Sequence, residues 1–285
     1  GAHRADAATA SPPAPVDADV ARISADPDAD IASFAQPSPT RVASPTAALL
    51  GFFFDLSLSL LLLTGLSLFG VAAVGFVRGL RGEDFAQTDP NSLIFVVVGL
   101  LATAISALIV YYFRRNANAI ERVDSWRALW RRSSWFSILV AVFACSGYSA
   151  LAGRLAHAMG VELTPTNQIL GEIIHAYPLT LLVFAVLIAP AYEELLFRRV
   201  LFGRLWAAGR PWLGLALSSA AFALVHEPPG LSASHGWGML MLWSVYALMG
   251  AVFAWIYYRS GSLWTAYLAH AGNNLIAGLM LLGEP

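Results

Sequence analysis

Two adjacent glutamates follow an apolar run. Ionisable side chains in such a segment cost free energy and usually belong to a functional site. Glu193, Glu194 and Arg198 come after Pro190 and the uncharged run 178–189. On a helix, Glu194 and Arg198 share a face at a spacing of four residues, whereas Glu193 points about 100° away. A desolvated carboxylate without a counter-ion holds protons more tightly, so Glu193 suits a general base beside the kink that Pro190 should cause. A structural ion pair at the membrane interface is the alternative, and it leaves Glu193 unexplained.

A histidine ends the next apolar stretch, in the motif Phe222-Ala-Leu-Val-His226. Glu193 and His226 are 33 residues apart, and the turn signal Gly-Arg-Pro at 209–211 lies midway between them. In an antiparallel hairpin at that turn, each residue is about 16 positions, or ~24 Å of helix, from the turn. The sequence therefore predicts that Glu193 and His226 meet at one depth. Taken alone, His226 could equally be a packing histidine.

The last apolar segment carries the motif His270-Ala-Gly-Asn-Asn274, in which His270 and Asn274 share a helical face. The preceding turn at 259–262 puts His270 about ten residues, or ~15 Å, into its helix. His270 is therefore ~9 Å closer to its turn than Glu193 and His226 are to theirs. For the three residues to meet, the hairpin that carries Glu193 and His226 must project towards the cytoplasm.

These polar groups suit peptide hydrolysis, which needs a base for water and donors for the oxyanion. We assign Glu193 and His226 to the water, and His270 and Asn274 to the oxyanion. Glu193, His226 and His270 also form a candidate zinc triad, so the sequence leaves open a Zn²⁺ ion or a metal-free activated water. Three further residues are expected to support the site: Glu194, Arg198 and Phe222.

The elements that position these residues are apolar helices. The chain has 285 residues, 58% hydrophobic and 12% charged, against a charged share of about 25% in soluble domains. Uncharged runs at 56–77, 90–113 and 133–153 each match the ~20 residues that cross a membrane as helix. We expect an all-α polytopic membrane protein with about seven transmembrane helices and a polar intramembrane site. The expected spans are 56–77, 92–113, 133–153, 177–200, 211–230, 237–258 and 262–282.

Charge predicts the orientation of the chain in its membrane. The loop 114–132 holds six arginines against Glu121 and Asp124, which places it in the cytoplasm, and alternation then makes the N-terminus cytoplasmic. The loop 78–89 argues weakly against this, because it carries two arginines outside. A formal net charge of -1 without a basic arm makes nucleic acid an unexpected partner.

Composition and the position of the polar motifs divide the chain into three regions. Residues 1–46 are rich in Ala, Pro, Ser and Asp, and are expected to form a disordered acidic tail without a secretory signal. Residues 47–155 are expected to be an accessory transmembrane region, and residues 156–285 the catalytic transmembrane domain. Asp55 is expected at the membrane interface, and Cys145 in helix packing.

At these motifs the chain resembles the CPBP family of intramembrane endopeptidases, also called the Abi or CaaX-protease group. The family pattern Glu-Glu-x-x-x-Arg, Phe-x-x-x-His and His-x-x-x-Asn occurs in order, and the resemblance covers about residues 177–281. It implies an all-helical fold, peptide-bond hydrolysis in or near the membrane, and catalytic roles for Glu193, His226, His270 and Asn274. The resemblance further implies a membrane-bound or lipidated protein or peptide as substrate, and either a metalloprotease or a metal-free activated water. We accordingly expect an integral protein of a bacterial cell membrane.

Other functions fit the sequence less well. A site-2-type protease needs His-Glu-x-x-His, but His226 and Glu227 are followed by Pro-Pro-Gly, and the aspartyl-protease motifs are absent. A rhomboid-like serine at Ser149 is better explained by helix packing. Two alternatives from other classes stay open: a non-catalytic scaffold or immunity factor, and a proton-coupled carrier, for which no mirrored second half is visible.

Overall fold

The computed structural model describes residues 44–87, 89, 92–166, 168, 173 and 176–283. Residues 1–43, which make up most of the predicted tail, lie outside them, and Pro45 begins the first described helix. The described residues form helices and no strands, so the all-α prediction is confirmed. The α-helices are α3 (Pro45–Leu80), α4 (Leu93–Arg114), α5 (Ala119–Leu129), α6 (Arg132–Ala158), α8 (Pro178–Val183), α9 (Ala189–Glu194), α10 (Gly203–Ala207), α11 (Pro211–His226), α12 (Trp237–Ser260) and α13 (Leu263–Gly283). Three short segments accompany them: the 3-10 turn η1 (Phe85–Gln87) and the π-helical segments η2 (Phe184–Ile188) and η3 (Leu195–Phe202).

Among the described residues, five helices are long and apolar enough to cross a membrane: α3, α4, α6, α12 and the continuous stretch Pro178–Ala207. Helix α11 is a shorter apolar helix of 16 residues. Helix α13 has 21 residues but carries a histidine and two asparagines, which lower its hydropathy. With α11 and α13 the five make the seven apolar helices predicted, and the chain is an integral membrane protein.

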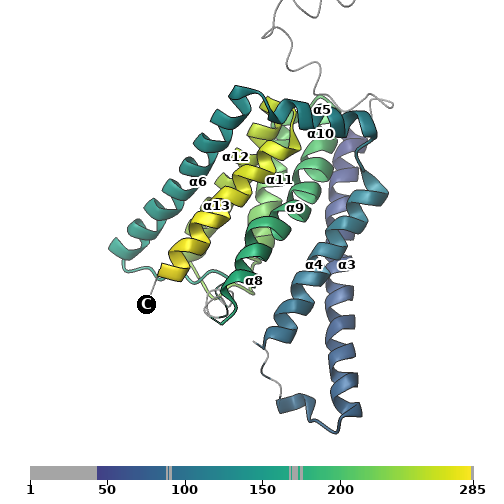
Figure 1. Ribbon diagram of the computed structural model, residues 1–285, viewed down its shortest axis with the longest axis vertical. Coiled ribbons are helices and arrows are strands. Elements are labelled where there is room, and N and C mark those ends of the chain that lie inside the picture. Colours follow the sequence, from purple (N-terminus) through teal and green to yellow (C-terminus); the bar gives the residue numbers. More distant parts are fainter. Residues whose placement is uncertain are drawn as a thin grey trace, which may run out of the picture.

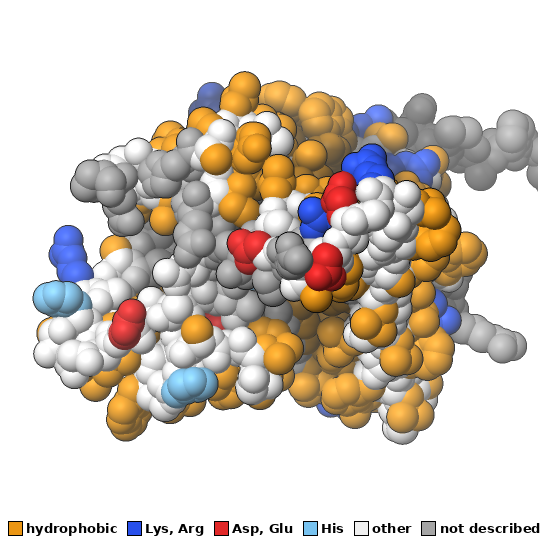
Figure 2. All heavy atoms as spheres, turned by 90° about the horizontal axis from the view of Figure 1, so that it is seen from below, with side chains coloured by type: hydrophobic (Ala, Val, Ile, Leu, Met, Phe, Trp, Pro, Cys, Tyr) orange, Lys and Arg blue, Asp and Glu red, His pale blue; other side chains and the backbone are white. Residues whose placement is uncertain are grey.

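The long helices run side by side, and α5 lies across one end of the bundle, which we call the α5 end (Figure 1). Helices α3 and α4 pack together as a hairpin, α11 packs on α12, and α6 packs on α12 and α13. Seen from the opposite end, hydrophobic side chains cover much of the outer surface (Figure 2). The turn between α10 and α11 forms where the sequence predicts it, with Gly209 at a φ of 72° that favours glycine.

The stretch that carries the glutamates is not a uniform α-helix. Glu193 and Glu194 end the six-residue helix α9, which lies between the π-helical segments η2 and η3. Pro190 stands near the start of α9, where its missing N–H interrupts the regular hydrogen-bond ladder. Short π-helical turns of this kind occur often at functional sites. The sequence predicted a break in the hydrogen-bond ladder at Pro190, but it did not predict the π-helical turns.

An ion triad around a buried aspartate joins the α3–α4 hairpin to the rest of the bundle. Asp55, expected at the membrane interface, is fully buried inside the protein. Its carboxylate accepts from Arg114 of α4, with Nε 2.6 Å from Oδ1, and from Arg204 of α10, with Nε 2.9 Å from Oδ2. Buried charges are tolerated when they are paired in this way, so the triad fixes α3 against both α4 and α10.

Candidate active site

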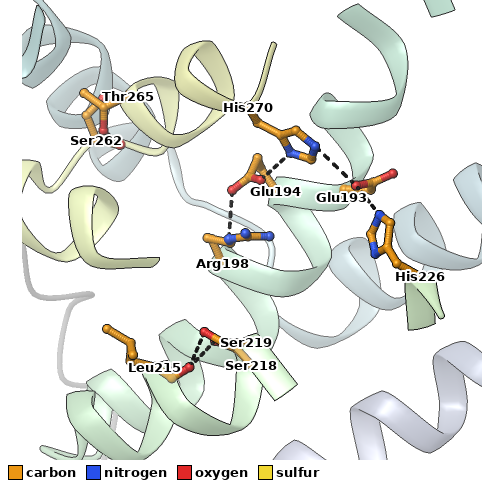
Figure 3. A network of polar contacts seen from close by, with 10 residues as sticks. All are labelled: Glu193, Glu194, Arg198, Leu215, Ser218, Ser219, His226, Ser262, Thr265 and His270. Atoms are coloured by element: carbon orange, nitrogen blue, oxygen red, sulfur yellow. Dashed lines mark hydrogen bonds and ion pairs between the residues drawn. The ribbon is translucent and has the colours of Figure 1, made fainter. Parts of the chain in front are cut away.

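Side chains from three separate stretches of chain meet inside the bundle (Figure 3). Glu193, Glu194 and Arg198 come from α9 and η3, His226 from the last turn of α11, and His270 from α13. All five residues were singled out in the sequence.

Glu194 is the buried centre of one half of this cluster. Arg198 Nε lies 3.1 Å from Glu194 Oε2, and both side chains are 1% exposed, so the predicted ion pair is confirmed. His270 Nδ1 lies 2.8 Å from Glu194 Oε1. Glu194 therefore holds a cation and also orients a histidine, a second contact that the four-residue spacing did not predict.

Aromatic rings enclose the guanidinium of Arg198. Its Cζ lies 4.6 Å from the ring centroid of Phe222 and 5.2 Å from that of Phe253, and its Nη atoms have no hydrogen-bond partner among the described residues. Phe253 also stacks on His270, with ring centroids 4.9 Å apart. A desolvated cation between ring faces is stabilised electrostatically, so the two phenylalanines hold Arg198 where hydrogen bonds do not.

Glu193 faces both histidines. Its Oε2 lies 3.7 Å from His226 Nε2 and 3.7 Å from His270 Nε2, so the predicted meeting of Glu193 and His226 at one depth is confirmed. Glu193 Oε2 is buried and has no hydrogen-bond partner among the described residues.

The protonation of the two rings follows from what their other nitrogens contact. His226 Nδ1 lies 2.8 Å from the carbonyl oxygen of Phe222, and His270 Nδ1 faces the carboxylate of Glu194. Both partners only accept hydrogen bonds, so each Nδ1 carries a proton, and in the neutral ring each Nε2 presents a lone pair to Glu193. Three acceptor atoms that face one another repel unless a hydrogen-bond donor or a cation lies between them. The arrangement is suited to hold a water molecule that donates to it.

The same three atoms are of the types that bind zinc, and Nδ1 contacts to a carbonyl and a carboxylate are usual behind zinc-bound histidines. No group of three or more His, Cys, Asp or Glu residues in the described part of the chain is arranged so that it could hold a metal ion. In these positions the three side chains do not surround a metal ion, so a zinc ion would require them to shift.

Asn274 stands apart from the cluster. Its Nδ2 donates to the backbone carbonyl of Ala185 in η2, at 2.8 Å. The neighbouring Asn273 is buried, and its Oδ1 accepts from Ser146 Oγ of α6 at 3.1 Å. Of the four residues predicted to be catalytic, Glu193, His226 and His270 are thus brought together, whereas Asn274 contacts a neighbouring helix.

Two further residues of the site were not singled out in the sequence. Tyr246 of α12 stacks on His226, with ring centroids 4.7 Å apart, and Phe253 of the same helix covers His270. Helix α12 is apolar and aromatic on all sides, so its sequence holds no signal that distinguishes these two positions.

Glu227 directly follows His226, and its fully buried carboxylate has a structural partner. Its two oxygens accept from the backbone N–H and the hydroxyl of Thr166, each at 2.8 Å. Its backbone carbonyl accepts from Trp243 Nε1 at 2.8 Å. These bonds fix the end of α11 to the loop after α6 and to α12, which holds His226 in place.

A cavity of about 690 Å³ adjoins the cluster from the α5 end. It lies between α5, α9 and α13, and Glu194 is part of its wall, but Glu193, His226 and His270 are not. Arg199, another wall residue, pairs with Glu121 of α5 at 2.6 Å, from Nη2 to Oε2. In the loop beside it, burial lowers the pKa of Arg115 from 12.5 to about 10, and the positive charges of Arg199 and Arg204 add to this effect.

Two comparisons with known proteins found matches to membrane peptidases. Residues 175–276 match the family model described as type II CAAX prenyl endopeptidase Rce1-like. The Bacillus subtilis (strain 168) protein named "Putative membrane peptidase YdiL" is 30% identical over 160 residues, which are 55% of this chain and 57% of that relative. The chain thus spans little more than half the length of this curated relative, and no solved structure matches it. The matched segment holds every residue of the three motifs.

Proposed function

We propose that the chain, whose residues 175–276 match the CAAX prenyl endopeptidase branch of the CPBP family of membrane proteases, is an intramembrane endopeptidase that uses a water activated by Glu193. One observation carries this proposal: Glu193 Oε2 lies 3.7 Å from His226 Nε2 and 3.7 Å from His270 Nε2, and we infer that a water binds at the point where it reaches this oxygen and a histidine nitrogen. A water at that point can donate one proton to Glu193 and the other to a histidine.

In the proposed reaction, Glu193 Oε2 takes a proton from the water, and the water oxygen attacks the carbonyl carbon of the scissile peptide bond. His226 Nε2 accepts a hydrogen bond from the remaining O–H and so orients it. The C–N bond then breaks, and the proton on Glu193 passes to the leaving nitrogen, which gives a new amine and a new carboxyl group. A positioned base of this kind contributes about 10²–10⁴-fold to rate.

The oxyanion that forms on the carbonyl needs a hydrogen-bond donor. His270 is neutral in the free enzyme and supplies one when its Nε2 takes a second proton from surrounding water in the substrate complex, because Nδ1–H still bonds Glu194 while Nε2–H then faces the reacting oxygen. Glu194 and Arg198 keep the ring of His270 in this orientation. The oxyanion role predicted for Asn274 would require its amide to leave the carbonyl of Ala185 or to use its second N–H.

We further propose a membrane-bound or lipidated protein or peptide as the substrate, and a bacterial cell membrane as the location. The arginine-rich α5 end would then face the cytoplasm, and so would the N-terminus, because basic loops stay on that side. A zinc ion, if the enzyme uses one, would be held by Glu193, His226 and His270 and would lower the pKa of its bound water.

Two alternative functions use these residues differently. A non-catalytic scaffold would need the glutamates only for packing, and a proton-coupled carrier would need the Glu and His residues as a proton relay. The buried acceptor of Glu193 without a hydrogen-bond partner weighs against the scaffold, because it costs free energy that packing does not recover.

The test compares membrane proteins of cells that express the wild type or Glu193→Gln. We expect a precursor to accumulate and its new N-terminus to vanish in Glu193→Gln only. The control is Glu162→Gln, which changes an exposed glutamate outside the site and should leave the cleaved termini unchanged. Identical termini in wild type and Glu193→Gln, with both proteins inserted at equal levels, would refute the proposal.

A further inference from the structure

The π-helical segment η2 leaves one backbone carbonyl without its usual donors. The N–H of Ala189 donates to the carbonyl of Phe184, five residues earlier, and therefore does not donate to the carbonyl of Ala185. In the same π-helical pattern the next donor to Ala185 would be the N–H of residue 190, but residue 190 is proline and has none. The Ala185 carbonyl thus lacks both of the backbone bonds that an α- or a π-helix would give it.

Asn274 supplies the missing bond from another helix. Its Nδ2 donates to the Ala185 carbonyl at 2.8 Å. Helix-breaking prolines are tolerated in membrane helices when a neighbouring helix satisfies the freed backbone group, because no water is available to do so. The asparagine on α13 and the proline on α9 are therefore two parts of one structural device.

This device lies directly beside the proposed catalytic groups. Tyr267, His270 and Asn274 are spaced i, i+3 and i+7, so they share one face of α13. All three contact the stretch from η2 to α9: Tyr267 through its hydroxyl to the carbonyl of Leu187 at 3.2 Å, His270 through Glu194, and Asn274 through Ala185. This face of α13 therefore contacts the stretch on both sides of the proline. We expect these contacts to set the distance from His270 to Glu193.

We propose that Asn274 is a positioning residue that replaces the N–H missing at Pro190, and so holds the π-helical segment η2 and the following α9, which presents Glu193 to the two histidines. This role differs from the direct oxyanion contact that the motif suggested. The inference depends on the proposed function only for its activity readout, because the hydrogen bond itself can be tested by stability.

The test is a double-mutant cycle of Asn274→Ala and Pro190→Ala. Replacing Pro190 restores an N–H in register with the Ala185 carbonyl, so the asparagine should then be dispensable. In the wild-type background we expect Asn274→Ala to slow cleavage about tenfold, as loss of one hydrogen bond to a partly buried carbonyl would. In the Pro190→Ala background we expect Asn274→Ala to slow it less than about twofold. If Asn274 were instead an oxyanion donor, its loss would cost about 10²–10³-fold in both backgrounds, and the proposal would fail.

The same four proteins are compared by thermal unfolding in detergent, which does not require a substrate. Asn274→Ala should lower Tm by several degrees in the wild-type background and by less than half as much beside Pro190→Ala. Asn273→Ala is the matched control, because its amide contacts Ser146 of α6, so its effect on Tm should be the same in both backgrounds. Equal Tm losses for Asn274→Ala in the two backgrounds would overturn the inference.

The two readouts separate this inference from the proposed function. If the wild type cleaves nothing while the Tm cycle shows the expected coupling, the proposed function fails and the role of Asn274 stands. Pro190→Leu also restores the N–H, and replaces Pro190→Ala if that variant does not accumulate in membranes.

Discussion

Replacement of Arg198 by Met should destabilise the protein far more than replacement of an exposed arginine. The variant leaves the carboxylate of Glu194 buried without its cation, since both side chains are 1% exposed and Nε lies 3.1 Å from Oε2. Removal of one partner of a buried pair costs about 3–5 kcal/mol. His270 still donates to Glu194 in the variant, so we expect the lower end, about 3 kcal/mol. That loss is a large part of the roughly 5–15 kcal/mol that holds a typical protein folded.

The assay is denaturant unfolding of the purified protein in detergent, with the free energy of unfolding as the measured quantity. Arg127→Met is the control, because Arg127 is exposed on α5 and its loss should change stability by less than about 0.5 kcal/mol. A double variant, Glu194→Gln with Arg198→Met, tests the cause. A neutral amide needs no cation, and its oxygen can still accept from His270, so the double variant should regain most of the lost stability.

Two outcomes would refute this reasoning. Equal losses for Arg198→Met and Arg127→Met would mean that the ion pair contributes no more than an exposed charge. A double variant no more stable than Arg198→Met would mean that the loss comes from the packing of the guanidinium between Phe222 and Phe253, and not from a stranded carboxylate.

Three other expectations follow from the geometry. Asp55→Asn should lower the free energy of unfolding by about 1.5–3 kcal/mol, because Arg114 and Arg204 lose their common carboxylate; an unchanged denaturant midpoint would contradict the role of Asp55 in joining the helices. His226→Gln should lower kcat by about 10²–10⁴-fold with a Tm near that of the wild type, and a kcat within twofold of wild type would remove His226 from the reaction. Treatment of the purified enzyme with 1,10-phenanthroline should leave cleavage unchanged if Glu193 acts on a metal-free water, whereas a loss that Zn²⁺ restores would show that a metal takes part.

The contact between Glu193 and His226 could be predicted from the sequence because it depends only on chain length and one turn. The turn at 209–211 lies midway between the two residues, and any antiparallel hairpin that bends there brings them to one depth. The pair of Glu194 and Arg198 was predictable for a similar reason, since a spacing of four residues stays on one face over a single turn. Such contacts need no knowledge of the other helices.

The remaining contacts depend on departures from regular helix geometry or on packing across the bundle. A period of 3.6 residues per turn does not describe η2 and η3, so the facing of residues on either side of Pro190 could not be computed from spacing. The partner of Asn274 is a backbone carbonyl, which every residue carries and no sequence pattern marks. Asp55 bonds residues 59 and 149 positions away, and only the assembled bundle brings them together.

The proposed catalytic cluster has an excess of negative charge, which should lower the free energy of unfolding of the wild type. With neutral histidines, Glu193 and Glu194 face the single cation Arg198, and a buried oxygen of Glu193 has no hydrogen-bond partner among the described residues. Glu193→Gln removes the excess negative charge, and its amide N–H can donate to the Nε2 of one histidine. We therefore expect Glu193→Gln to abolish cleavage while it raises the free energy of unfolding by about 1–3 kcal/mol. The Glu162→Gln control, on an exposed loop, should leave both quantities unchanged. A Glu193→Gln protein less stable than the wild type would mean that the carboxylate is held by favourable contacts, and that the site stores no strain for catalysis to use.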